Sequence, residues 1–260
     1  MKQQKISESQ FGNAAERYLT SPVHAQGKDL ERLAALVKRT DPVKALDLGS
    51  GAGHASFALA SSGAHVTACD PSVNMLEVVS REAKRRGLPI ETVLSPAEKL
   101  PFEDASFDLI VTRYSAHHWR DLKVALAEAA RVLVPGGKLV VVDSIAPEEP
   151  LFDTILQTIE LLRDASHVRN YRVSEWKSML EDAGFSVGES DVWVVRIEFE
   201  SWITRLNTPP ARVGALRTVF PDLPDEAQRY FGIGKDYSFD LGTAWVEATR
   251  CQQDVKQEAK

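Results

Sequence analysis

Short hydrophobic runs alternate with helix-compatible stretches through the middle of the chain. The five runs are residues 43–48, 65–69, 90–94, 107–111 and 138–143. Each is followed by a segment that can form a helix, most clearly 121–134, where apolar residues recur at helical spacing. This repeated strand-helix pattern predicts a doubly wound parallel α/β sheet with helices on both faces. A TIM barrel would need eight such units, which the sequence after Asp143 does not supply.

The two ends of the chain show different patterns. Residues 1–41 are polar with helical periodicity, and we expect an N-terminal helical lid there. After the fifth run, the pattern predicts a long helical stretch over 150–184 and strand-like alternation over 185–200. A helical insertion over 201–234 and a last strand over 235–250 follow. The two later strands bring the predicted sheet to seven.

Composition narrows the class of protein. A chain of 260 residues with 43% hydrophobic residues can bury a core without disulfides or metal. Cys69 and Cys251 lack metal-ligand spacing, and they fit a reducing compartment. The net charge of −6 gives no attraction to nucleic acid, and no apolar stretch is long enough to span a membrane. We expect a cytoplasmic single domain over 1–260, with its core at 42–200, that is a monomer or homodimer and binds no metal.

A glycine-rich turn follows the first predicted strand directly. In the segment ALDLGSGAGH, Gly49, Gly51 and Gly53 let the backbone turn sharply and approach a ligand closely. A tight strand-to-helix connection would also explain the glycines alone. Asp70, however, ends the second predicted strand, where a carboxylate can accept hydrogen bonds from ribose hydroxyls.

Two residues of this segment indicate the kind of nucleotide. His54 occupies the position of the third glycine in the dinucleotide fingerprint. Asp47 lies two residues before the first glycine, where its carboxylate would repel a pyrophosphate and attract a cationic ligand. The turn therefore favours a cationic nucleoside without phosphate.

Five blocks together resemble the class I S-adenosylmethionine (SAM) dependent methyltransferases, in the branch that includes the ubiquinone and menaquinone biosynthesis enzymes. The blocks are LDLGSGAGH at 46–54, ACDPSVNML at 68–76, AEKLPF at 97–102, SFDLIVTRYSAHHW at 106–119 and EAARVLVPGGKLVVVD at 128–143. They occur in the order and spacing of that family. The resemblance implies a Rossmann-like fold, SAM as cofactor and a small-molecule methyl acceptor.

The resemblance also assigns cofactor contacts. The implied set is Tyr18, Asp47, Gly49, Ser50, Gly51, Gly53, His54, Asp70, Pro71, Met75, Ala97, Glu98 and Arg113. Within it, Asp47 and the glycine turn would meet the methionine end of SAM, and Asp70 the ribose. Many relatives bind the adenine amino group with an Asp at the position of Pro96. That contact would here be lost or moved to Ala97 or Glu98.

Residues beyond the cofactor set are candidates for catalysis and acceptor binding. His117 and His118 follow the fourth predicted strand, and an imidazole there can take a proton from the acceptor at neutral pH. Either could instead bond a backbone carbonyl, and of the two we prefer His118 as the base. Arg163, His167 and Tyr171 are candidates for acceptor binding, with Arg163 and His167 on one helix face if the helix persists. A solvated helix end is the alternative.

The expected function is methyl transfer from SAM to an oxygen, nitrogen or carbon atom of a small molecule. Alternatives are a SAM-binding scaffold or partner subunit without catalysis, and a nicotinamide-dependent oxidoreductase. His54 and Asp47 argue against the oxidoreductase. An RNA methyltransferase is opposed by the acidic charge balance.

Overall fold

A seven-stranded sheet forms the centre of the molecule. The computed structural model describes residues 3–12, 14–21, 25–37 and 43–252. The strand order is β3-β2-β1-β4-β5-β7-β6. The strands are β1 Lys44–Leu48, β2 His65–Asp70, β3 Ile90–Leu94, β4 Phe107–Arg113, β5 Leu133–Ser144, β6 Phe185–Ile197 and β7 Phe239–Arg250. The predicted seven-stranded α/β fold is confirmed.

The five strands whose pattern predicted a parallel sheet do pair in parallel, whereas the two later strands, whose direction was not predicted, make the sheet mixed. The neighbours from β3 to β5 pair in parallel, whereas β7 is antiparallel to both β5 and β6. The reason is the connection between β6 and β7. A parallel pair needs a crossover to the opposite end of the sheet, but a chain that returns from the same end enters as an antiparallel neighbour. The helical insertion after β6 makes that same-end return.

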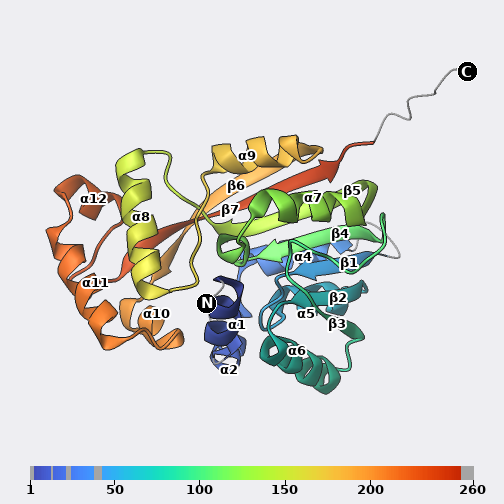
Figure 1. Cartoon of the computed structure of the whole chain (residues 1–260), viewed down its shortest axis with the longest axis horizontal. Helices are drawn as coiled ribbons and strands as arrows, with labels where there is room; N and C mark the ends of the chain where they lie inside the picture. The colour runs from blue at the N-terminus through green and yellow to red at the C-terminus, as the bar shows by residue number, and fades with distance from the viewer. Residues whose placement is uncertain (1–2, 13, 22–24, 38–42, 253–260) are drawn as a thin grey trace, which may run out of the picture.

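Helices cover both faces of the sheet (Figure 1). On one face, α4 (Lys28–Val37) and α5 (His54–Ser61) bury side chains against Ala45 and Val66, and α6 (Val73–Arg86) packs beside them. On the other, α7 (Leu122–Val132) and α9 (Val173–Asp182) pack against residues such as Leu46. Alternate residues of one strand thus pack into the hydrophobic cores on opposite faces of the sheet, which explains why the central strands are apolar throughout.

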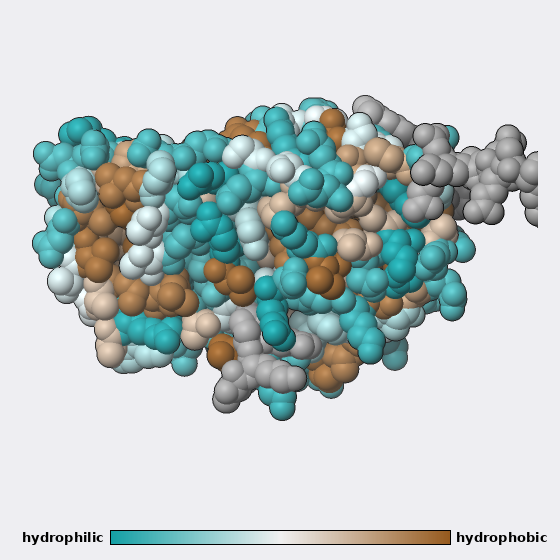
Figure 2. All heavy atoms as spheres, turned by 45° about the horizontal axis from the view of Figure 1, so that its top comes forward, coloured by the Kyte–Doolittle hydropathy of each residue, from teal (hydrophilic) through white to brown (hydrophobic). Residues whose placement is uncertain are grey.

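Four helices form a lobe beside the sheet, at the left of Figure 1. They are α8 (Pro150–Arg163), α10 (Phe199–Arg205), α11 (Pro210–Asp222) and α12 (Asp225–Tyr230). Their apolar core contains the fully buried Phe199 and Phe220, together with Trp202. Figure 2 shows hydrophobic surface gathered over this lobe. Leu151 and Leu161 of α8 are exposed. The same core includes Ile197 of β6 and Phe239 of β7, so the lobe packs against this end of the sheet.

The long helical stretch predicted over 150–184 is wrong. Helix α8 ends at Arg163 and α9 begins at Val173, with a loop over 164–172 between them. The break has a local cause, because the Asp164 carboxylate accepts hydrogen bonds from the backbone N–H and the hydroxyl of Ser166, both at 2.7 Å. Side chain to backbone bonds of this kind compete with the helix. Arg163 and His167 consequently do not share a helix face.

Two short helices at the N-terminus, α1 (Gln3–Gly12) and α2 (Ala15–Leu19), pack against α6. They lie in the range over which the sequence predicted a helical lid. The boundary predicted between 41 and 42 lies outside the described residues. Over the described ranges, no helix is long and apolar enough to cross a membrane.

Candidate active site

A large cavity of about 670 Å³ lies where the carboxyl ends of β1, β2 and β4 meet. Open α/β sheets bind ligands at this edge, where the strand order reverses direction. Its wall includes almost the whole predicted cofactor set: Tyr18, Asp47, Gly49, Ser50, Gly51, His54, Asp70, Pro71, Met75, Ala97, Glu98 and Arg113. Gly53 is the exception, since it occupies the N-cap of α5 behind the wall. Twelve of the thirteen residues predicted to contact the cofactor therefore line one cavity.

The glycine turn fits tightly against the loop after β4. Gly49 has φ +72°, and a Cβ placed on it would lie 1.9 Å from the Ser115 hydroxyl oxygen. The N–H groups of Gly49 and Ser50 both donate to the carbonyl of Cys69. The hydroxyl of Ser50 is buried without a hydrogen-bond partner among the described residues. That hydroxyl is therefore available to a ligand.

Two buried carboxylates face this cavity. Asp70 accepts the N–H of Gly51 on Oδ2 at 2.9 Å and the N–H of Ser72 on Oδ1 at 2.8 Å. Asp47 accepts from the N–H and the hydroxyl of Ser56, at 2.8 and 2.6 Å. Burial raises the pKa of each carboxyl to about 6, although these hydrogen bonds oppose the shift. Each Asp70 oxygen keeps acceptor capacity, which two ligand hydroxyls can use.

Three further predicted residues connect the elements around the cavity. The carboxylate of Glu98 accepts the N–H of Arg120 at 2.9 Å, and the side chain of Arg113 forms an ion pair with Asp29 of α4. His54 donates from Nε2 to the carbonyl of Tyr18 at 3.1 Å, and burial lowers its pKa. A neutral His54 thereby ties the N-terminal segment to α5.

A smaller cavity of about 70 Å³ adjoins the first, with which it shares the lining residues Phe11, Tyr18, Tyr114 and His118. Its other wall comes from the helical lobe and the far strands. There it is lined by polar and charged residues, namely His117, Ser144, Glu160, Arg163, Arg205 and Thr243, and by the apolar Val195, Ile197, Trp202 and Leu241. A small acceptor molecule bound here would lie next to a ligand of the larger cavity.

The two adjacent histidines have different surroundings. His117 and His118 lie in the 3₁₀ turn η1 (Ala116–His118) after β4. His117 donates from Nδ1 to Oδ1 of Asp143 at 2.6 Å. Burial disfavours its charged form, but Asp143 outweighs burial and raises the pKa of His117. Over the described chain, Nε2 of His117 has no hydrogen-bond partner, and the residue lines the smaller cavity.

His118 is held by the loop after α8 instead. Its Nδ1 donates to the carbonyl of Ser166 at 3.4 Å, and its Nε2 lies 3.9 Å from Asp164. Burial and the neighbouring His117 lower the pKa of His118, so it is neutral and a weak base at physiological pH. The geometry thus favours His117 as a proton acceptor over His118, which we preferred from the sequence.

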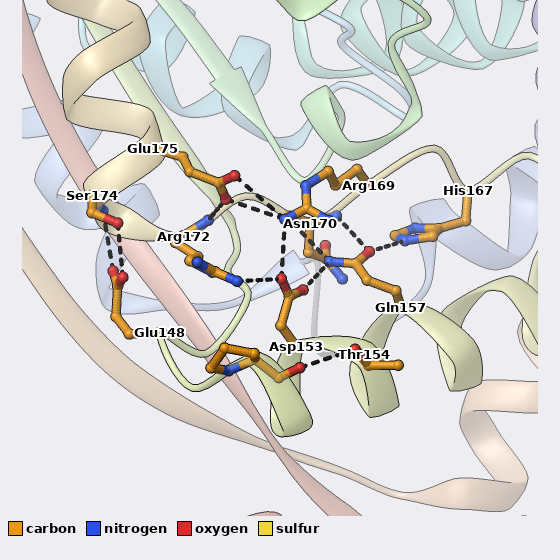
Figure 3. Close-up of polar contacts among 11 residues, drawn as sticks. Glu148, Asp153, Thr154, Gln157, His167, Arg169, Asn170, Arg172, Ser174 and Glu175 are labelled. Atoms are coloured by element: carbon orange, nitrogen blue, oxygen red, sulfur yellow. Dashed lines mark hydrogen bonds and ion pairs between the residues drawn. The ribbon is translucent and has the colours of Figure 1, made fainter.

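A polar network holds the loop over 164–172 (Figure 3). Asp153 of α8 accepts hydrogen bonds from Arg169, Arg172 and Gln157. The side-chain oxygen of Gln157 accepts from Nε2 of His167 and from the backbone N–H of Asn170. The loop in turn donates two backbone N–H groups to the carbonyl of His117. The network therefore fixes the backbone that carries the histidine pair.

Two of the predicted acceptor-binding residues make their contacts away from the two cavities. His167 points to Gln157 within the network (Figure 3), and Tyr171 packs edge-on against Trp176. Neither lines either cavity. Only Arg163 of the three predicted residues does. The shared helix face of Arg163 and His167 was expected only if the helix persisted, and the helix ends at Arg163.

Sequence reasoning missed Asp143, Glu160 and Arg205. Asp143 follows the same rule that identified Asp70, because it lies near the carboxyl end of β5, and this signal could have found it. Arg205 and Glu160 had no local signal. No group of three or more His, Cys, Asp or Glu side chains suited to a metal ion occurs in the part of the chain that the structure describes.

Comparison with known proteins gives consistent matches. The model of a methyltransferase domain family matches residues 46–141. The uncharacterized methyltransferase YcgJ of Bacillus subtilis is 34% identical over 94% of this chain and 99% of its own. The uncharacterized protein YafE of Escherichia coli is 41% identical over 75% of this chain and 95% of its own. The crystal structure of YcgJ superposes with a TM-score of 0.80, covering 85% of this chain and 99% of that one.

Proposed function

The chain belongs to the class I SAM-dependent methyltransferases, and we propose that it methylates a hydroxyl group of a small molecule with His117 as the general base. Methyl transfer from SAM follows from the family. The acceptor and the base are our proposal. The observation that carries it is the His117–Asp143 pair, whose free Nε2 belongs to the wall of a cavity adjoining the larger one.

The residues of the larger cavity fit SAM. Its volume is within the range of about 300–1,000 Å³ typical of small-molecule sites. Asp70 has acceptor capacity for the two ribose hydroxyls, the Ser50 hydroxyl lacks a partner within the described ranges, and Asp47 places negative charge near the glycine turn. We assign the amino acid end of SAM to Asp47 and the turn, and the ribose to Asp70.

The chain's own residues supply the remaining chemistry. When bound, SAM provides a methyl group on a positively charged sulfur, which keeps the electron pair of the broken C–S bond. His117 accepts the acceptor's proton at Nε2 as the acceptor oxygen forms its bond to the methyl carbon. Asp143 holds the tautomer that leaves Nε2 unprotonated, and it stabilises the imidazolium once it forms. Phe11 and Tyr18, which line both cavities, help to exclude water.

Ligand binding and product labelling test this function together. SAM and its demethylated product should raise the melting temperature, because a ligand at 100 times its dissociation constant adds about 2.7 kcal/mol of stability. NAD and NADP should leave it unchanged. Incubation of the protein and isotopically labelled SAM with a metabolite extract should then yield a labelled methyl ether. Stabilisation by NAD alone, or label only on nitrogen or carbon, would contradict the proposal.

The affinity for SAM should depend on pH. In the free protein burial raises the pKa of Asp70 to about 6, so below pH 6 this carboxyl is protonated and is a weaker acceptor. Asp47 has the same raised pKa and should contribute in the same direction. The affinity should therefore be constant above pH 7 and fall by up to about tenfold per pH unit and per group below 6. Calorimetry between pH 5 and 8 measures this, and a flat profile would show that neither carboxylate meets the ligand.

A further inference from the structure

The smaller cavity combines aromatic walls with two guanidinium groups. Phe11, Tyr18, Tyr114 and Trp202 contribute rings to the wall. Arg163, at the end of α8, and Arg205, at the end of α10, contribute the positive charge. Such walls with a few fixed polar groups suit the orientation of a small ligand. At about 70 Å³ this cavity is smaller than a whole ligand site, so it would hold one part of a ligand whose remainder extends into the adjoining larger cavity. The charged groups of the wall indicate the chemical class of that ligand.

Arg163 is already partnered within the protein. It is 7% exposed, donates from Nε to the carbonyl of Trp202 at 3.3 Å and hydrogen bonds to the hydroxyl of Tyr18. Glu160 lies one helical turn earlier on α8 and also lines the cavity. Its carboxylate offsets the charge of Arg163. Burial raises the pKa of Glu160 and so weakens this compensation.

Arg205 is not neutralised in the same way. Its guanidinium lies 5.9 Å from the centre of the Tyr18 ring. Within the described ranges it forms no ion pair, and its side chain donates no hydrogen bond. Burial and the like charge of Arg163 lower the pKa of Arg205, although Tyr18 and Glu160 act in the opposite direction. The charged form is therefore incompletely stabilised by its surroundings. An anion placed in this cavity would supply the missing partner.

Arg205 is also held in position at its backbone. Its carbonyl accepts a hydrogen bond from Nε of Arg17 at 2.9 Å, which joins α2 to α10. Tyr18, the next residue of α2, contacts both arginines. The N-terminal helix and the lobe thus meet at the cavity, and its charged groups are fixed from two sides.

We propose that the acceptor is a hydroxylated aromatic carboxylic acid whose carboxylate binds at Arg205, with Arg163 beside it. The inference rests on the proposed function, since it assigns the smaller cavity to the acceptor. A planar carboxylate matches the fork geometry of a guanidinium, and the aromatic ring suits the surrounding rings. The acceptor hydroxyl then meets Nε2 of His117, on the same cavity wall, and gives up its proton there. Arg205 determines specificity, and it takes no part in the proton transfer.

A matched pair of probes tests the charge preference. Benzoate and benzamide have nearly the same shape and differ in charge. Calorimetry on protein saturated with the demethylated product of SAM should show benzoate binding about tenfold or more tightly than benzamide. Arg205→Gln should reduce this preference to about threefold or less, with the affinity for benzamide unchanged. Arg205→Lys should keep part of it, because the charge remains but the fork is lost.

The control is Arg217→Gln. Arg217 lies on α11 of the same lobe, is paired with Glu200 and lines neither cavity, so this variant should keep the full preference for benzoate. Equal binding of the two probes, undetectable binding of both, or a preference that survives Arg205→Gln would overturn the inference. Affinity for the demethylated product is measured first on each protein. If that ligand fails to bind, the proposed function itself fails, and the two results are thereby distinguished.

Discussion

Replacement of His117 by Gln should lower the turnover of methyl transfer by about 10²- to 10⁴-fold, the usual contribution of a general base. The affinity for SAM should stay within about threefold, because His117 lines only the smaller cavity. The physical reason is the loss of an imidazole that Asp143 has made more basic. Single-turnover measurements with labelled SAM, combined with calorimetry, separate the two effects.

The pH profile identifies the base further. A proton acceptor gives the rate an acidic limb at its own pKa, and Asp143 raises the pKa of His117 above its ordinary value of 6.5. The limb should therefore lie above pH 6.5 in the unaltered protein and vanish in His117→Gln. Asp143→Asn should slow turnover and move the limb to lower pH, since the carboxylate no longer stabilises the imidazolium.

Two histidine variants serve as comparisons. His65→Gln removes an exposed imidazole at the start of β2 and should leave turnover unchanged. His118→Gln should have a smaller effect than His117→Gln and should keep the acidic limb, because His118 is bound to the loop after α8 and its pKa is lowered. If His118→Gln abolished the limb and His117→Gln did not, the base would be His118, as the sequence first suggested.

The central fold could be predicted because it depends on local patterns. Strands such as β3, Ile90–Leu94, are short apolar or β-branched runs between helix-forming segments. The bounds of β3 agree with the sequence pattern, whereas β5 begins at Leu133, inside the predicted helix over 121–134. The position of the cavity followed from the same patterns, since Gly49 and Asp70 come directly at or after strand ends. These features need no knowledge of distant residues.

Most of the interpretations that the structure changes depend on contacts between distant segments. His117 and His118 are neighbours in the sequence, and what separates them chemically is Asp143 on another strand and Ser166 in the loop after α8. Arg205 reaches the smaller cavity only because the insertion returns to the sheet beside α2. The break of the predicted helix at Asp164 was the one error with a local signal, an Asp-x-Ser sequence that caps its own backbone.

Removal of the Asp70 carboxylate should weaken SAM binding strongly. Hydrogen bonds to a charged group contribute about 1.5–3 kcal/mol, so Asp70→Ala should raise the dissociation constant by about 10- to 150-fold. Asp70→Asn should be intermediate, because it keeps one acceptor oxygen but loses the charge and must also serve the N–H groups of Gly51 and Ser72. Calorimetry with SAM at pH 7.5, where the carboxyl is ionised, measures both variants.

A variant at a second aspartate tests whether Asp70 binds the ligand directly or only supports the backbone around it. Asp108, at the start of β4, accepts the backbone N–H of Lys44 at 2.9 Å and lines neither cavity. Asp108→Ala therefore removes a comparable carboxylate to backbone bond at the opposite end of the sheet, and SAM affinity should be unchanged. Equal losses of affinity in the two Ala variants would mean that Asp70 acts through the shape of the glycine turn. The contact belongs to the Asp70 carboxylate if, of the two Ala variants, only Asp70→Ala loses affinity. In that case Asp70→Asn should also keep only the fall in affinity below pH 6 that Asp47 contributes.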